Sequence, residues 1–221
     1  MFSTEGHASI LVRGGRRDAR KAPSPAVCWF CQTGAIIAIA TRPLTGGEVF
    51  WCRRLFGDAI DYAPVRVHAG SYFWFNLQRR HTAVAPDGHI WFNRADFSPD
   101  FAREHAWRLL WFVHEMTHVW QHQLGYPVKW RGALRIGLPY AYALAPHKRL
   151  CDFNMEAQGD LLADYFALRF LLAPQAMRQR QYGNALALYD TVLQDFLRAP
   201  HERTNLPRSV FSRLCGAWRA T

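Results

Sequence analysis

Apolar and polar residues follow two different periods along this 221-residue chain. Before residue 95 the apolar runs are short: "APVRVHAG" alternates like a strand, and "TAVAPDGHIWFN" predicts two strands around a turn at residues 86–88. Beyond Pro99 the apolar positions recur at helical spacing in three segments, which end near residues 124, 172 and 199. The pattern predicts an α+β fold, a small N-terminal β-layer followed by a mainly helical part.

The predicted helices carry recognisable end signals. Thr45 can cap a short helix over "GGEVFWCRRLF". Ser98 followed by Pro99 predicts the start of the central helix, which runs through "EHAWRLLWFVHEMTHVWQHQL" and ends at Gly125. A further long helix should begin near Asp152. Because the central helix is apolar around most of its girth, we expect it to be buried.

Both ends of the chain differ in composition from its middle. We expect residues 1–40 to form an extension that is disordered or targeting-like, residues 41–200 the domain, and residues 201–221 a C-terminal extension. The apolar run "AVCWFCQTGAIIAIA" is too short to span a bilayer. Basic residues before it and "AIA" at its end fit a secretory signal, and a packed or non-native extension is an equal alternative.

Composition narrows the class of protein. Half of the residues are hydrophobic and 14% are aromatic, which excludes a disordered chain. The net charge of +10 favours anionic partners, but arginines spread along the chain give no sign of a dedicated nucleic-acid partner. Five cysteines are too few and odd in number for a disulfide scaffold, and the lone CxxC at residues 28–31 is a weak zinc or redox motif.

The central helix contains the chemical motif "HEMTH". His114 and His118 stand at i and i+4 and therefore share one helix face, while Glu115 is turned about 100° away. In such an HExxH arrangement the histidines bind zinc and the glutamate serves water as a general base. The alternative is a pair of core histidines satisfied by hydrogen bonds. Burying two imidazoles and a carboxylate costs several kcal/mol unless something such as a cation compensates.

A third ligand is expected from "NMEAQGD", because a hydrolytic zinc site uses three protein ligands and leaves one position open. Glu156 is our candidate for a single Zn²⁺ ion, and Asp160 would hold the other N–H of a ligand histidine. The alternative is a solvated acidic face, since Asp164 continues the same line. His122 lies about 12 Å along the axis from His114, too far to share the ion.

These motifs resemble a known family. "HEMTH" followed by "NMEAQGD" resembles the gluzincin type of zincin metallopeptidase. More narrowly, "RPLTGGE", "LFGDAIDYAPVRVH", "APDGHIWFN", "FVHEMTHVWQHQ" and "YAYAL" resemble small bacterial vgr-related proteins and the metallopeptidase domain fused to some type VI secretion spike (VgrG) proteins. The resemblance covers residues 42–170, approximately.

The resemblance implies a zincin-like fold and a zinc metallopeptidase that acts as an antibacterial type VI secretion effector, delivered to the periplasm of a target cell. Its implied partners are a peptide or protein substrate, a spike protein and an immunity protein. It also implies that substrate pairs with an edge strand, for which we nominate "HIWFN", residues 89–93. Tyr140, Tyr142 and His147 are candidates to stabilise an oxyanion, and the sequence does not choose among them.

Two further functions fit the same residues. One is a metal-dependent amidase that acts on cell-wall peptide, an anionic polymer suited to a basic surface. The other is a non-catalytic module that zinc stabilises and that docks on a secretion spike.

Overall fold

The computed structural model describes residues 40–72, 82–129 and 139–208 of the chain. Its sheet has four strands in the order β1-β2-β4-β3, namely β1 (Ala40–Pro43), β2 (Arg66–Ala69), β4 (Ile90–Phe92) and β3 (Ala83–Val84). The strand pairs β1/β2 and β4/β3 are antiparallel, and β2/β4 is parallel. The longer helices are α1 (Gly46–Phe56), α2 (Ala106–Gln123), α4 (Met155–Phe166) and α5 (Leu186–Arg198). The predicted α+β class is confirmed.

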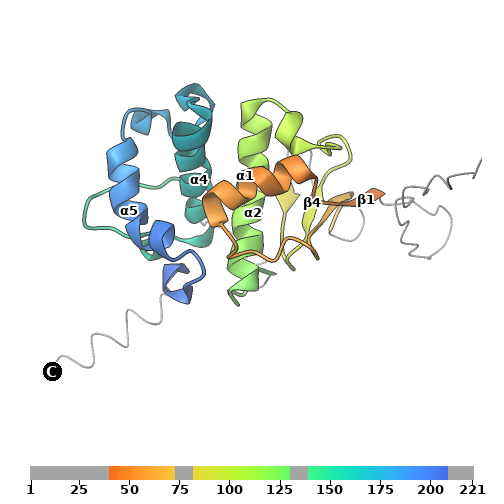
Figure 1. Ribbon diagram of the computed structural model, residues 1–221, viewed down its shortest axis with the longest axis horizontal. Helices are drawn as coiled ribbons and strands as arrows, with labels where there is room; N and C mark the ends of the chain where they lie inside the picture. The colour runs from red at the N-terminus through yellow and green to blue at the C-terminus, as the bar shows by residue number, and fades with distance from the viewer. Residues whose placement is uncertain (1–39, 73–81, 130–138, 209–221) are drawn as a thin grey trace, which may run out of the picture.

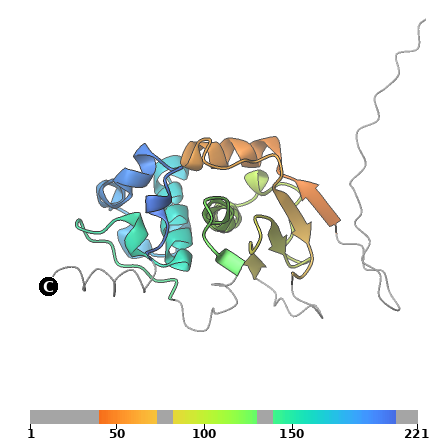
Figure 2. The same ribbon diagram turned by 90° about the horizontal axis from the view of Figure 1, so that it is seen from below.

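Helix α2 lies at the centre of the molecule. Figure 2 looks nearly along its axis and shows the sheet on one side of α2, α4 and α5 on the other, and α1 crossing above them. Figure 1 shows α2 and α4 side by side. Twelve of the 18 residues of α2 are buried, which confirms that the helix is central. A helix that is apolar around most of its surface needs packing partners on more than one side, and the sheet and the other helices supply them here.

Aromatic side chains fill the space on both sides of α2. Toward the sheet, Phe101 packs between Phe92 of β4 and Phe112 of α2, with ring centroids 4.4 and 5.3 Å apart. Toward α5, Trp120 meets Phe196 edge to face at 5.3 Å. Aromatic pairs in these geometries add to the free energy that burial of apolar area contributes. The two clusters fix the position of α2 in the fold.

Helix α1 begins as its sequence predicts. The Thr45 hydroxyl accepts from the backbone N–H of Glu48, and the Glu48 carboxylate accepts from the backbone N–H of Thr45. Glu48 is fully buried, and both of its oxygens also accept from the guanidinium of Arg42 in β1, at 2.7 and 2.8 Å. A buried carboxylate needs such a bidentate partner. The capping box therefore also attaches α1 to the sheet.

The starts of two helices differ from expectation. Helix α2 does not start at Pro99, because Asp100 caps a separate 3₁₀ turn at Phe101–Arg103, while the Ser98 hydroxyl donates to Glu104. Helix α4 starts at Met155 and not near Asp152, because the side chain of Asn154 accepts from its first backbone N–H groups. Asn154 thus caps α4 with a short polar side chain, whereas α2 begins after His105, which makes no capping hydrogen bond with its side chain.

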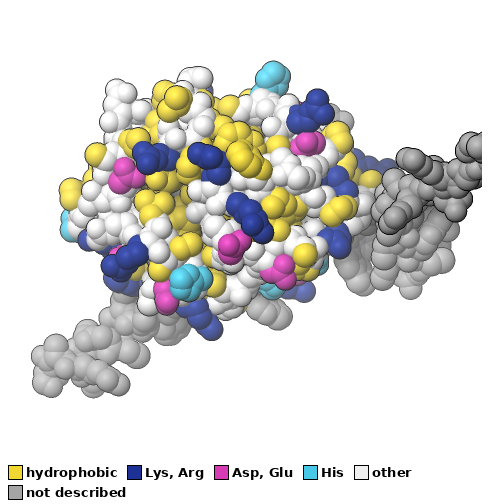
Figure 3. All heavy atoms as spheres, in the orientation of Figure 1, with side chains coloured by type: hydrophobic (Ala, Val, Ile, Leu, Met, Phe, Trp, Pro, Cys, Tyr) yellow, Lys and Arg dark blue, Asp and Glu magenta, His cyan; other side chains and the backbone are white. Residues whose placement is uncertain are grey.

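Several expectations concern residues outside the described ranges. The N-terminal arm, its signal-like apolar run and the CxxC at 28–31 lie there, as do residues 130–138 and 209–221. Packing continues past residue 200, since Asn205 is buried and its carbonyl accepts from the amide of Gln158. Over the described ranges, no helix is both long and apolar enough to cross a bilayer. On the face drawn in Figure 3, Lys and Arg side chains are scattered among acidic and apolar ones.

Candidate metal centre

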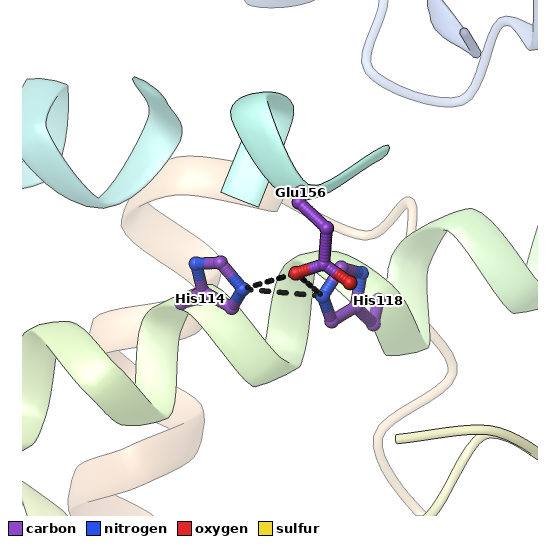
Figure 4. Close-up of side chains that lie close together, drawn as sticks. All are labelled: His114, His118 and Glu156. Carbon is purple, nitrogen blue, oxygen red and sulfur yellow. Dashed lines mark hydrogen bonds and ion pairs between the residues drawn. The ribbon is translucent and has the colours of Figure 1, made fainter. Parts of the chain in front are cut away.

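Two histidines of α2 and one glutamate of α4 meet where these helices pack together (Figure 4). The Nε2 atoms of His114 and His118 lie 3.2 Å apart, and each is 3.4 Å from Oε2 of Glu156. The exposed fractions of the three residues are 6%, 1% and 0%. The i, i+4 spacing puts both imidazoles on the same side of α2, and the packing of α4 brings the carboxylate to them.

A carboxylate orients the first imidazole. Nδ1 of His114 donates to Oδ1 of Asp160 at 2.8 Å, and Asp160 stands one turn after Glu156 on α4. With its proton on Nδ1, the neutral ring directs the lone pair of Nε2 toward Glu156 and His118. This is the arrangement that a carboxylate behind a metal-binding histidine provides.

A glutamine orients the second imidazole. The amide nitrogen of Gln121 donates to the carbonyl of Met155 at 3.2 Å and to Oε1 of Gln158 at 2.8 Å. These two acceptors determine which end of the Gln121 amide is oxygen, and that oxygen lies 2.9 Å from Nδ1 of His118. Nδ1 of His118 must therefore be the donor, so its Nε2 also presents a lone pair to the centre.

The three ligand atoms fit a small tetrahedral cation. Two ligands about 2.0 to 2.1 Å from Zn²⁺ at the tetrahedral angle stand about 3.3 Å apart, and the measured separations are 3.2, 3.4 and 3.4 Å. Two nitrogen lone pairs and a carboxylate that converge in a buried site repel one another unless a positive charge lies between them. The donor set and its spacing are compatible with Zn²⁺.

A proton competes with a cation for this position. Burial lowers the pKa of His114, but hydrogen bonds to Asp160 and Glu156 outweigh it and raise the pKa to about 10. Burial alone would raise the pKa of Glu156, whereas His118 and His114 hold that pKa well below its usual range. The carboxylate therefore stays charged, and a metal ion that bound here would displace a proton from His114.

Gly159 makes the centre sterically possible, and sequence reasoning missed it. A Cβ atom at this position would lie 2.6 Å from Cε1 and 2.7 Å from Nδ1 of His114, closer than Cβ contacts occur. Glycine inside a helix costs about 1 kcal/mol relative to alanine, so its place within the buried helix α4 needs a reason. That reason is the approach of the His114 ring to the α4 backbone. In the sequence, a glycine inside the predicted helix, between Glu156 and Asp160, was the sign that another group approaches the backbone there.

A cavity opens beside the ligands, and we call it the β3 cavity. It has a volume of about 420 Å³ and is lined by Thr82, Ala83, Trp111, His114, Glu115, Tyr140, Asp160 and Arg178. Glu115 is only 3% exposed and lines the same cavity as His114. A molecule bound in the cavity could contact both His114 and Glu115.

Only one of the three oxyanion candidates lies in this cavity. The ring of Tyr140 lies 6.1 Å from that of His114. Tyr142 is buried, and its hydroxyl donates to Asp164 at 2.6 Å. His147 is exposed and lines neither of the two cavities at the centre.

His122 lies apart from the three candidate ligands. Its ring packs against Gly88, in the turn between β3 and β4. The i+8 position on α2 therefore contributes to packing of the hairpin turn and not to the cluster of His114, His118 and Glu156.

The nominated edge strand was wrong. "HIWFN" forms β4, which pairs with β2 on one side and β3 on the other. The edge strand beside the cavity is β3, whose Ala83 lines it together with Thr82. Alternation identifies strands but not their order, and the parallel pairing of β2 with β4 places the later strand inside the sheet.

Comparison with known proteins gives the family. No protein-family profile matches the chain. The type VI secretion system spike protein VgrG2b of Pseudomonas aeruginosa is 39% identical over 187 residues, which cover 73% of this chain and 18% of that protein, so the chain spans about a fifth of its length. The solved effector domain of the same VgrG2b matches with a TM-score of 0.55 and 36% identity, over 71% of this chain and 82% of that structure. The chain belongs to the family of the VgrG2b effector domain and is thereby related to type VI secretion effectors.

Proposed function

We propose that this protein is a zinc-dependent metallopeptidase with a zincin-like, gluzincin-type site, and that it acts as a type VI secretion effector. The convergence of His114, His118 and Glu156, with both Nε2 atoms turned inward and Glu115 in the adjoining cavity, is the observation that carries the proposal. This arrangement combines a three-ligand centre with a carboxylate base and room for a substrate.

Each residue of the centre has a distinct task in this proposal. His114, His118 and Glu156 would hold the ion, which supplies a Lewis acid that polarises a peptide carbonyl and acidifies water. Glu115 accepts a proton from the attacking water on its carboxylate and passes it to the nitrogen of the leaving amine. Asp160 keeps the ring of His114 in place throughout, because it accepts from Nδ1 at 2.8 Å.

The walls of the β3 cavity suit an extended peptide. Strand β3 is one of the two edge strands of the described sheet, and a peptide can pair with the backbone of an edge strand. Tyr140 lines the same cavity, is 47% exposed, and can turn its hydroxyl toward a developing oxyanion. Peptide-bond hydrolysis therefore fits the shape of the site as well as its chemistry.

The biological setting extends the same proposal. Because the VgrG2b relative is a spike protein and this chain matches a fifth of it, association with a secretion spike is part of the proposed function. An effector that is toxic to bacteria also requires an immunity protein in the producing cell. Both are partners to be sought by co-purification.

The metal is tested by elemental analysis of the purified protein. We expect about one equivalent of zinc in the wild type and loss of that equivalent in Glu156→Ala, because the ion would lose its only charged ligand. Glu202→Gln, at an exposed glutamate far along the chain, is the matched control. Retention of zinc by Glu156→Ala would remove this residue from the site.

Catalysis is tested separately with Glu115→Gln. This variant should keep zinc but lose activity by about 10²- to 10⁴-fold, the usual contribution of a general base. Casein and purified peptidoglycan as substrates distinguish a protein peptidase from a cell-wall amidase. A zinc-bound Glu115→Gln protein with full hydrolytic or toxic activity would refute the mechanism and favour a non-catalytic module.

A further inference from the structure

A second cavity, here called the arginine cavity, adjoins the β3 cavity at His114. It has a volume of about 400 Å³, and its wall includes Trp107, Met177, Arg178 and Arg180. It shares four lining residues with the β3 cavity: Trp111, His114, Asp160 and Arg178. Glu115 lines only the β3 cavity. Arg178 therefore borders both cavities, as His114 does, and a substrate bound beside β3 would lie in a space that Arg178 lines.

The backbone at Arg178 is attached firmly to α4. Asp164 accepts from the backbone N–H of Arg178 at 2.7 Å and from that of Gln179 at 2.9 Å. Asp164 stands two turns after Glu156 on the same face of the helix. It also accepts from the hydroxyl of Tyr142 at 2.6 Å. Asp164, which in the sequence could be the end of a solvated acidic face, thus positions the backbone of Arg178 relative to Glu156 on the same helix.

The acidic residues of the arginine cavity are engaged elsewhere. Asp164 accepts three hydrogen bonds from its own surroundings, and Asp160 accepts from His114. Within the part of the chain that the structure describes, the guanidinium groups of Arg178 and Arg180 form no hydrogen bond and no ion pair. Both arginines are exposed, and their guanidinium groups keep N–H donors for a bound anion.

We propose that Arg178 is a specificity-determining residue that binds a carboxylate of the substrate, next to the bond that is cleaved. This inference rests on the proposed peptidase function and adds the class of substrate, a peptide with a negative charge on one side of the cleaved bond. A guanidinium binds a carboxylate through two parallel N–H···O bonds, which gives direction as well as attraction. The indole of Trp111, shared by both cavities, supplies an apolar wall for the rest of that residue.

The carboxylate can come from an acidic side chain or from the C-terminus of the substrate. Three ligands distinguish these sources, each a malonyl hydroxamate joined to a dipeptide, because a hydroxamate binds zinc directly. The first carries Leu-Ala amide, the second Leu-Ala with a free carboxylate, and the third Leu-Glu amide. Their dissociation constants are measured by calorimetry on the zinc-loaded protein, so the readout does not depend on turnover.

We expect at least one of the two acids to bind the wild type about 10- to 100-fold more tightly than the neutral amide, and the tighter acid identifies the source. Arg178→Gln should abolish this preference, and Arg178→Lys should keep part of it, since it retains the charge without the fork. Arg103→Gln, which removes an exposed arginine outside both cavities, should leave the preference intact.

The outcomes separate this inference from the function on which it rests. If all three hydroxamates bind the wild type equally, or if the preference survives in Arg178→Gln, the metal centre stands and the role of Arg178 is refuted. If none of them binds the zinc-loaded protein, the proposed function fails and this inference fails with it.

Discussion

Replacing Gly159 by alanine should destroy the metal centre while leaving the fold largely intact. The new methyl carbon would lie 2.6 Å from Cε1 of His114, whereas ordinary contact begins at 3.4 Å, so the ring must retreat by about 0.8 Å (3.4 − 2.6). A shift of that size moves the ring away from Asp160, now 2.8 Å from Nδ1, or moves Nε2 away from the ion. Metal–ligand distances tolerate deviations of only about 0.2 Å.

The expected loss of zinc affinity is about 100-fold or more, because disturbing the partners of a ligand alone costs about 10- to 100-fold. The effect on folding is smaller. Crowding in a packed region costs about 1 to 3 kcal/mol, and alanine recovers about 1 kcal/mol of helix propensity. We therefore expect a folded protein whose thermal unfolding temperature no longer rises when zinc is added.

The assay is competition for zinc between the protein and a chelating indicator, combined with thermal unfolding in the presence and absence of zinc. Gly46→Ala is the matched control, because nothing lies within 4 Å of a Cβ built at this first residue of α1. Wild-type zinc affinity in Gly159→Ala would show that the two helices can separate without disturbing the site. That result would refute the argument that close approach of α4 to His114 builds the centre.

Two further predictions concern Gln121, which orients His118, and His68, which lies in the sheet. Gln121→Leu removes the acceptor of Nδ1 of His118 and should lower zinc affinity by about 10- to 100-fold in the same competition assay; unchanged affinity would contradict the role assigned to this glutamine. On the sheet, burial and the neighbouring His89 lower the pKa of His68 from 6.5 to about 4, so between these values the unfolded chain binds more protons than the folded one. The free energy of unfolding should therefore fall as the pH drops from 7 to 5, by about 1 kcal/mol for this partly exposed ring. His68→Phe, which can keep the stacking on Trp91, should reduce that pH dependence in urea titrations, and an unchanged dependence would assign it to other groups.

Local elements were the most predictable part of the fold. The cap of α1 depends on Thr45 and Glu48, three residues apart, and the end of α2 depends on Gly125, whose φ of +85° suits glycine. The start of α2 was less predictable, since Ser98 and Asp100 both offer capping oxygens and only the packed structure shows that Asp100 begins a separate turn. The order of the strands could not be read from alternation at all.

The sequence by itself determined that His114 and His118 share one face of a buried helix, because hydrogen bonding within the helix sets that spacing. It also marked Glu156 and Asp160 as a second pair on one face. Only the tertiary structure decided that the two faces meet, with their ligand atoms 3.2 to 3.4 Å apart.

The tertiary structure also decided the roles of the residues that surround His114, His118 and Glu156. Gly159 allows α4 to approach the His114 ring, Gln121 orients His118, and Asp164 holds Arg178 beside the centre. The sequence offers a local sign of two of these residues, a glycine inside a helix and a glutamine three residues after His118. What each of the three residues does depends on contacts between different segments, such as the bonds of Gln121 to α4, and the packing of the core determines such contacts.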